Sequence, residues 1–321
     1  MRREILALAV FGAAACSAAA AEASELAAPR ASIHTDSSRL AVDGGSIWYR
    51  VTGTGTGTPV ILLHGGPGFS SYYLKSMEAL GDDRLVVRYD QLGGGKSDRM
   101  VDTTKFTIAH FVAELEALRR HLGLQRVHVY GHSWGTILGL EYYRAHPEHV
   151  ASLVLASAAL DLPAWERNAR RLLATLPDSM QRAVQVREAE RNYEAADYQA
   201  ALAEFYGRYV WRHPVPADLD SSMASFNPAI YGYMQGPSEF TITGTLKDYD
   251  AKPFLEEIRV PVLYTVGEFD EANPEIIGEH AALTPGARLV VIPGAAHLVQ
   301  WDNPEANLRA VREFLREVDQ R

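Results

Sequence analysis

The sequence predicts an α/β fold in which helices cover both faces of a mostly parallel, doubly wound sheet and a helical cap is inserted into the chain. Short apolar runs rich in β-branched residues alternate with segments of helical spacing through most of the chain. Between residues 159 and 252 the alternation stops, and the sequence there is mostly amphipathic helix. We therefore expect a targeting segment at 1–22, the first part of the core at 39–158, the cap at 159–252 and the second part of the core at 253–321.

The strands of the core are predicted in chain order from these runs. An alternating segment at 46–52 is followed by Gly-Thr repetition up to residue 58, which indicates a turn. Six apolar runs follow, each of a length that suits a strand buried on both faces. They are residues 60–63, 85–89, 127–130, 153–155, 262–266 and 289–292. A helix is predicted over 106–122, because apolar residues recur there three and four positions apart.

The first 22 residues have the features of an export signal. Arg2 and Arg3 precede a short apolar run, and small residues follow it. The run is too short to span a bilayer, so we expect no transmembrane span. Export to the periplasm or the cell exterior follows, with cleavage after the three alanines at 19–21. Acylation of Cys16, as in a lipoprotein, is the alternative. Residues 22–38 are expected to be a mobile leader.

Composition excludes several classes of protein. Of the 321 residues, 47% are hydrophobic and 22% are charged, which is ordinary for a globular protein and excludes collagen-like and wholly disordered chains. The net charge of −9 repels phosphate backbones, so we expect no nucleic-acid partner. A single cysteine can form neither an internal disulfide nor a cysteine-based zinc site. No metal and no organic cofactor is implied, and the oligomeric state is left open.

The segment Gly131-His132-Ser133-Trp134-Gly135 has the G-x-S-x-G pattern of a serine nucleophile. The pattern is weak when it stands alone, but here an apolar strand leads into it and a helix of apolar spacing leads out. The serine then lies on a sharp turn between strand and helix, and the flanking glycines relieve crowding. We predict Ser133 as the catalytic nucleophile. A bystander serine in a glycine-rich turn is the alternative.

A serine nucleophile needs a general base and a carboxylate that orients the base. In folds with this turn the chain order is serine, acid, histidine. Asp270 follows the run 262–266 and His297 follows the last run, so we predict them as acid and base. The competing His280 is expected at the surface of a helix. Three earlier acids in or beside the cap are expected to be solvated or to cap helices: Asp161, Asp248 and Asp250.

Acyl transfer also needs backbone N–H groups that face the developing oxyanion. One donor should be the amide of Trp134, directly after the nucleophile. The other should come from the glycine-rich loop after the run 60–63; Gly66 is the first candidate and Gly65 the second. His64 is expected to pack under this loop. Residues 90–97 do not match a phosphate-binding loop and are expected to shape the floor of the site.

Five motifs occur along the chain in a fixed order. They are HGGPG at 64–68, YDQ at 89–91 with the glycines and serine after it, GHSWG at 131–135, Gly267-x-x-Asp270 and Gly294-x-x-His297. Together they resemble the proline iminopeptidases, α/β hydrolases that include the tricorn-interacting aminopeptidase subgroup. The resemblance runs from about residue 40 to the end and implies the α/β-hydrolase fold and an aminopeptidase activity. Two positions depart from the family: Leu92, where many members carry Arg, and Gly94, where Cys is common. Leu92 favours the tricorn-interacting subgroup over strict proline specificity.

The cap contains a further motif of this family. The sequence Gly-Pro-Ser-Glu-Phe at 236–240 looks like the family's G-P-x-E-F segment. The family binds the free α-amine of its substrate with acidic side chains, which by resemblance are Glu239 and Glu271 here. Two buried carboxylates would reject an N-acylated substrate, because it leaves their charge uncompensated. The alternative for both is an ordinary surface or loop acid. Three aromatic residues are candidates for the side-chain pocket or for packing within the cap: Tyr231, Tyr233 and Phe240.

We therefore expect a serine aminopeptidase that releases an N-terminal residue, often proline, through an acyl-enzyme. Its partner would be a short peptide or amino-acid amide with a free N-terminal amine. An amino-acid amidase is the nearest variant, since it needs the same amine site. A carboxylesterase or lactonase would use the same triad but ignore Glu239 and Glu271. A non-catalytic ligand-binding protein is the remote alternative. Epoxide hydrolases and dehalogenases are disfavoured, because they carry aspartate where Ser133 stands.

Overall fold

The computed structural model describes residues 35–100, 102–214 and 217–321. The predicted export signal and Cys16 lie outside these residues, so cleavage, acylation and export stay predictions. Within the described ranges no helix combines the length and the apolar character that crossing a bilayer requires.

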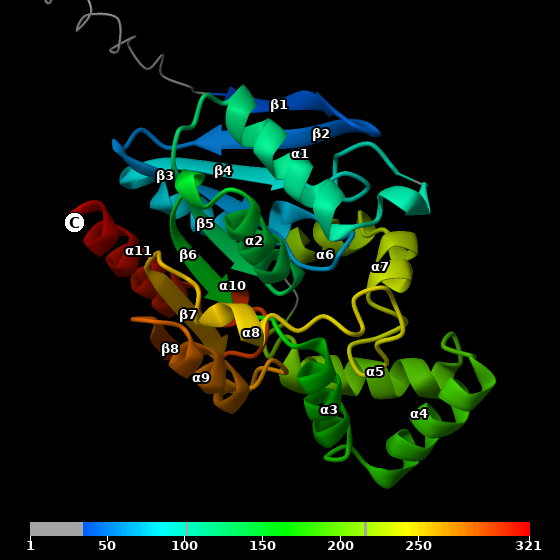
Figure 1. Ribbon diagram of the computed structural model, residues 1–321. Coiled ribbons are helices and arrows are strands. Elements are labelled where there is room, and N and C mark those ends of the chain that lie inside the picture. The colour runs from blue at the N-terminus through cyan, green and yellow to red at the C-terminus, as the bar shows by residue number, and fades with distance from the viewer. Residues whose placement is uncertain (1–34, 101, 215–216) are drawn as a thin grey trace, which may run out of the picture. The chain divides into compact units, whose positions relative to one another are not determined.

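The core is one eight-stranded sheet in the order β1-β2-β4-β3-β5-β6-β7-β8 (Figure 1). β2 pairs antiparallel with β1 and with β4, and every later pair is parallel. All residues of β5, β6 and β7 are buried, as expected for parallel strands covered on both faces. The strands are β1 (Thr35–Val42), β2 (Gly45–Thr52), β3 (Gly57–Leu63), β4 (Arg84–Asp90), β5 (Val127–His132), β6 (Val150–Ala156), β7 (Val262–Gly267) and β8 (Arg288–Ile292). The predicted fold class is confirmed.

The first strand corrects the sequence prediction of a mobile leader that extends to residue 38. β1 begins at Thr35 and forms a hairpin with β2, in which Val42 pairs with Gly45. Gly44 has a φ of 92°, a left-handed conformation that suits the turn between the two strands. The strand lies at the edge of the sheet and is mostly polar, so it gives no apolar signal in the sequence.

Helices cover both faces of the sheet. α1 packs on α2, and α2 packs on β3, β5 and β6. The opposite face is covered by α11, which packs on β3, β6, β7 and β8, and by η1, which packs on β4. The helices of the core are η1 (Ser71–Asp82), η2 (Thr103–Lys105), α1 (Ile108–His121), α2 (Trp134–Ala145), η3 (Pro147–His149), α9 (Pro274–Leu283), α10 (Val299–Asp302) and α11 (Pro304–Asp319). The helix predicted over 106–122 corresponds to α1 with η2 just before it.

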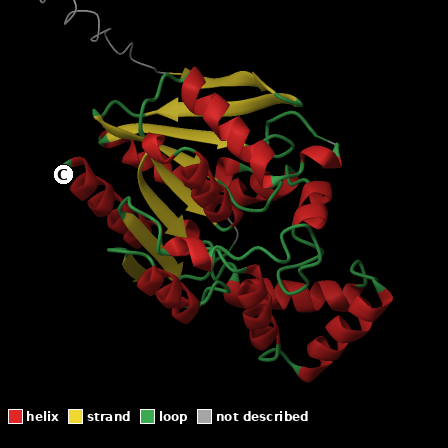
Figure 2. Ribbon diagram, viewed as in Figure 1, coloured by secondary structure: helices red, strands yellow, loops and turns green. Residues whose placement is uncertain are grey.

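The segment between β6 and β7 is helical, and Figure 2 shows its three longest helices grouped at the lower right, away from the strands of the core. Its helices are α3 (Leu162–Leu173), α4 (Asp178–Glu190), α5 (Ala196–Tyr209), α6 (Ala217–Ala224), α7 (Pro228–Met234) and α8 (Lys252–Leu255). The two ends of the segment meet, because Asp161 forms an antiparallel bridge with Asp250. Leu162 N–H also donates to the Tyr249 carbonyl at 2.9 Å. This pairing supports our proposal of a cap inserted at 159–252.

The topology brings the predicted site residues to one edge of the sheet. Parallel strands end at a common edge, and each of four parallel strands there is followed by a predicted site segment. β3 ends at Leu63 before the glycine-rich loop, and β5 ends at His132 before Ser133. β7 and β8 end shortly before Asp270 and His297. The cap leaves the core after β6 at this same edge.

Candidate active site

Ser133 lies on the sharp turn that its motif predicts. It is the residue between β5 and α2, and its φ of 55° and ψ of −125° are strained for a residue with a side chain. The turn needs the glycines on either side. A Cβ on Gly131 would lie 2.2 Å from the Gly135 carbonyl oxygen, and a Cβ on Gly135 would lie 2.3 Å from the Leu63 carbonyl oxygen. The serine side chain therefore lies at the carboxyl end of β5, an inner strand of the sheet.

Asp270 and His297 are bonded to each other. His297 Nδ1 lies 2.9 Å from Asp270 Oδ1, and both side chains are buried. Burial by itself would raise the pKa of Asp270, but the charge and hydrogen bond of His297 outweigh it and hold the pKa below its ordinary value. A proton on Nδ1 that donates to Asp270 leaves Nε2 free to accept one. The His297 ring also contacts the Trp165 ring, with centroids 5.4 Å apart, and Trp165 and Ser133 line the same pocket.

Of the two glycines predicted to donate to the oxyanion, only Gly66 has a suitable amide. The Gly65 N–H already donates to the Tyr73 hydroxyl at 2.6 Å, which corrects its place as the second candidate. Gly66 lines the pocket together with Ser133 and has a φ of 113°, a conformation that favours glycine. Trp134 is the first residue of α2, where amide groups have no partner within the helix.

Glu239, which is half-buried, and Glu271, which is fully buried, form an acidic cluster with two tyrosines. Glu239 lines the pocket beside Ser133 and accepts a hydrogen bond from the Tyr231 hydroxyl at 2.5 Å. Glu271 is 0% exposed, and neither of its carboxylate oxygens has a hydrogen-bond partner among the described residues. Burial raises the pKa of both groups, and the charges of Glu239 and Asp270 raise the pKa of Glu271 further. Tyr206 also belongs to the cluster. Burial is the main cause of the raised pKa of its hydroxyl, and the charges of both glutamates raise this pKa further.

The pocket wall differs from the aromatic wall that the sequence offered as a candidate. Phe240 is fully buried against Tyr198 and Phe205 inside the cap, and Tyr233 is 41% exposed. Tyr231 holds Glu239 instead of lining the pocket. The residues that line it are Gly66, Ser133, Trp134, Ile137, Ala159, Leu162, Trp165, Gln235, Glu239 and Leu246. Most of these residues are apolar. They come mainly from α2 and from two stretches of the cap that are far apart in the sequence, so no local sequence signal connects them.

Comparison with known proteins decides the family. The family described as the alpha/beta hydrolase fold matches residues 58–304. A proline iminopeptidase of Heyndrickxia coagulans is 40% identical over 280 residues, which cover 86% of this chain and 97% of the relative. This chain belongs to the proline iminopeptidase family. A proline iminopeptidase of Saccharolobus solfataricus is 31% identical over 292 residues, covering 89% and 94% of the two chains.

Solved structures agree with this assignment. The crystal structure of a Mycobacterium smegmatis proline iminopeptidase has a TM-score of 0.82 at 34% identity, and the match covers 88% of this chain and 99% of that one. The crystal structure of VinJ has a TM-score of 0.85 at 32% identity, with the same coverage of 88% and 99%. The resemblance predicted from the five motifs is confirmed.

Several other polar residues singled out in the sequence are buried or cap a helix and belong to the framework of the fold. His280 is 1% exposed on α9, which corrects the prediction of a surface residue; burial lowers its pKa to about 4. Asp161 caps α3 by accepting from Ala164 N–H at 2.9 Å, as predicted. His64 is buried under the glycine-rich loop, also as predicted. No group of three or more His, Cys, Asp or Glu side chains is arranged to hold a metal ion within the described ranges.

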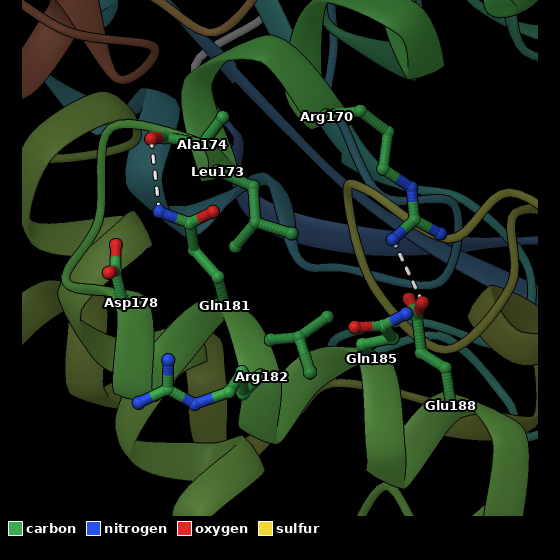
Figure 3. A pocket seen from close by; sticks show the side chains of 9 residues that line it. Arg170, Leu173, Ala174, Asp178, Gln181, Arg182, Gln185 and Glu188 are labelled. Atoms are coloured by element: carbon green, nitrogen blue, oxygen red, sulfur yellow. Dashed lines mark hydrogen bonds and ion pairs between the residues drawn. The ribbon is translucent and has the colours of Figure 1, made fainter.

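A separate cavity of about 340 Å³ lies between α3 and α4 (Figure 3). Its wall includes an Arg170–Glu188 ion pair of 2.8 Å, and Gln181 donates to the Ala174 carbonyl at 3.1 Å. None of the residues that line it is a catalytic, oxyanion or amine-binding residue predicted from the sequence.

Proposed function

We propose that this protein is a serine aminopeptidase that removes one N-terminal residue, proline or a small apolar residue, from peptides or amino-acid amides with a free amine. The observation that carries the proposal is a pair of neighbouring carboxylates: Glu239, which is half-buried and lines the pocket of Ser133, and Glu271, which is fully buried. Glu271 has no partner for either oxygen among the described residues, and a buried carboxylate is costly unless a cation or hydrogen-bond donor compensates it. A substrate ammonium supplies such a cation.

In the proposed reaction, Glu239 and Glu271 hold the ammonium, so that the first carbonyl of the substrate lies at Ser133. The Ser133 hydroxyl attacks this carbonyl while His297 Nε2 takes its proton, and Asp270 holds the imidazole in the required tautomer. The amides of Gly66 and Trp134 bind the oxyanion. His297 then returns the proton to the leaving amine, which departs and leaves the acyl-enzyme. Water, activated by His297, releases the amino acid and restores Ser133.

The apolar wall supports a preference for compact apolar first residues. Ile137, Ala159 and Leu162 line the pocket, and the Trp165 ring lies against His297. Such a wall fits a proline or alanine side chain, and it offers a long charged side chain no compensating charge apart from the glutamate reserved for the amine.

The test compares chromogenic amides of proline and alanine, each with a free and an N-acetylated amine. We expect turnover of the free-amine substrates, a loss of kcat/KM of at least about 100-fold on acetylation, and no turnover by Ser133→Ala. Equal rates on free and acetylated substrates, or turnover of simple esters alone, would replace the aminopeptidase with an esterase. Absence of turnover on every amide and ester would favour a ligand-binding protein.

A further inference from the structure

Gln91 connects the two loops that carry the proposed oxyanion donors. It follows β4, is 1% exposed, and uses every polar atom of its side chain. The side-chain amide nitrogen donates to the His64 carbonyl at 3.1 Å, and the side-chain oxygen accepts from Trp134 Nε1 at 2.8 Å. Its backbone N–H also donates to His64 Nε2 at 3.0 Å. One buried side chain thus joins the loop after β3 to the first residue of α2.

The loop after β3 is held so that a single amide remains for the substrate. Because His64 Nε2 accepts from Gln91, His64 Nδ1 carries the proton and donates to the Gly65 carbonyl at 2.8 Å. The Gly65 N–H donates to Tyr73. The next residue, Gly66, lines the pocket with Ser133, and its amide is the one we assign to the oxyanion.

Gln91 is itself anchored from the other side. The next amide along the chain, that of Leu92, donates to Glu114 Oε2 at 2.9 Å, and Glu114 is buried on α1. The Asp90 carboxylate, on the preceding residue, accepts from the Ser71 N–H and hydroxyl, both at 2.6 Å. Gln91 therefore lies in a fixed stretch of backbone between α1 and η1, and its side chain can act as a rigid spacer.

We propose that Gln91 is a positioning residue that sets the distance and orientation between the Gly66 and Trp134 amides. The inference deepens the proposed function and rests on one part of it, namely that Ser133 attacks the substrate and forms a tetrahedral intermediate. Oxyanion donors act when they lie within about 2.7–3.1 Å of the developing charge. The two amides belong to separate segments, so an error in their separation weakens transition-state binding while it leaves ground-state binding intact.

The test uses two substitutions in the full chain. Gln91→Met keeps the length of the side chain and removes both of its hydrogen bonds. Trp134→Phe removes the indole donor and keeps a single aromatic ring at this buried position of the pocket wall. Gln300→Met is the matched control, because Gln300 is also buried and its side-chain amide has no partner among the described residues. Two readouts are used: kcat and KM on the free-amine amide, and the rate at which a small fluorophosphonate modifies Ser133 with loss of fluoride. The second readout needs the oxyanion donors but no substrate amine.

For Gln91→Met we expect kcat and the phosphonylation rate to fall together by about 10- to 100-fold, with KM within about twofold of wild type. Trp134→Phe should show a smaller fall of the same kind. The double variant should be little worse than Gln91→Met, because both changes break one shared contact. Gln300→Met should keep the wild-type kcat. If Gln91→Met does not fold, Trp134→Phe carries the same expectation alone.

The proposal is overturned if Gln91→Met matches Gln300→Met in kcat, or if its whole loss lies in KM. The two readouts distinguish a failure of the Gln91 proposal from a failure of the proposed function. A wild-type protein that is phosphonylated at Ser133 but cleaves no free-amine amide would refute the aminopeptidase, and Gln91 would then be judged by the phosphonylation rate. A wild-type protein that is not phosphonylated at Ser133 would refute both.

Discussion

The same buried environment gives neighbouring side chains of the active site different charge states. Asp270 is kept ionised by His297, which lowers its pKa despite burial. His132 is kept neutral, because burial lowers its pKa to about 3, and it accepts from or donates to Tyr73 at 2.8 Å and bonds to the His297 carbonyl at 2.9 Å. Glu271 is pushed toward its protonated form by burial and by two neighbouring carboxylates. The active site therefore combines one ionised carboxylate, one neutral imidazole and two carboxyls whose pKa values are raised.

The raised pKa values of Glu239 and Glu271 predict how substrate affinity depends on pH. At acid pH both carboxyls are protonated and cannot compensate an ammonium. As pH rises through their raised pKa values they ionise, so KM for a free-amine substrate should fall. Above about pH 8 the substrate amine itself loses its charge, and KM should rise again. The measurement is KM against pH for a prolyl amide and for an ester without an amine. An equal pH dependence of KM for both substrates would contradict the amine site.

Sequence patterns identified the residues that carry local motifs and missed those that act through distant partners. Ser133, Asp270 and His297 each lie next to a strand end with a recognisable spacing, so the elbow and the Asp270–His297 pair follow from the sequence. Gln91 lies in the YDQ motif, which gave it no individual role, and Asn168 has no such signal. Their importance comes from hydrogen bonds to residues 43 and 103 positions away, which only the folded chain brings into contact.

Two helices of the cap reach into the active-site loops of the core. The carbonyl of Tyr209, at the end of α5, accepts from both Glu271 N–H and His297 N–H at 3.2 Å. The last carbonyls of a helix have no partner within it, so these two loops satisfy a group that would otherwise be orphaned. On α3, Asn168 donates to the Glu271 carbonyl at 2.7 Å and accepts from Asn273 at 3.0 Å. The cap therefore holds the backbone of the proposed amine and base loops.

Asn168→Ala should loosen the loop that carries Glu271. The Glu271 carbonyl would lose a buried donor, so we expect a loss of about 1–3 kcal/mol in the free energy of unfolding. We also expect a rise in KM for free-amine substrates of about 10-fold, because the carboxylate is no longer aligned with the ammonium. Urea unfolding and steady-state kinetics measure both effects. Asn192→Ala, at an exposed position of the same cap, is the control and should change neither. An unchanged KM in Asn168→Ala would show that α3 does not position Glu271.

The elements themselves were predictable to the extent that their residues are apolar or periodic. The six apolar runs correspond to β3 to β8. Five of these strands lie inside the sheet, where both faces are covered, whereas β8 is an edge strand in which Leu289 and Val291 are exposed. β1 was missed because an edge strand obtains its stability from pairing with β2 and needs no apolar run. The α3–α5 region was recognised as helical from its composition, but the way it contacts the core depends on carbonyl and amide groups that every sequence contains.

Over the whole molecule, three buried histidines link stability to pH. Burial lowers the pKa of His128 and His280 to about 4 and that of His132 to about 3. The folded state keeps these rings neutral, whereas the unfolded chain protonates them near pH 6.5. The unfolded state therefore binds more protons as pH falls from 6.5 to 4, and the free energy of unfolding should decrease over this range.

His280→Leu should reduce this sensitivity to acid. A pKa lowered from 6.5 to about 4 corresponds to at most about 3 kcal/mol between those two pH values. The variant should lose less stability than wild type when urea unfolding is repeated from pH 6.5 to pH 4. His213→Leu, at an exposed position, should follow the wild-type slope. If His280→Leu also keeps the wild-type slope, His280 is protonated equally in both states and the assignment is wrong.

Recognition of the free amine by Glu239 and Glu271 is the step that separates an aminopeptidase from an esterase, and Glu271→Gln removes one of the two charges. The measurement is the ratio of kcat/KM for a free prolyl amide to that for its N-acetylated form, in wild type, Glu271→Gln and the exposed control Glu275→Gln. We predict a ratio of at least about 100 in wild type and in the control, and a fall of the ratio by about 10-fold or more in Glu271→Gln, because the glutamine cannot compensate the ammonium. A ratio that is unchanged in Glu271→Gln would show that Glu271 does not bind the amine.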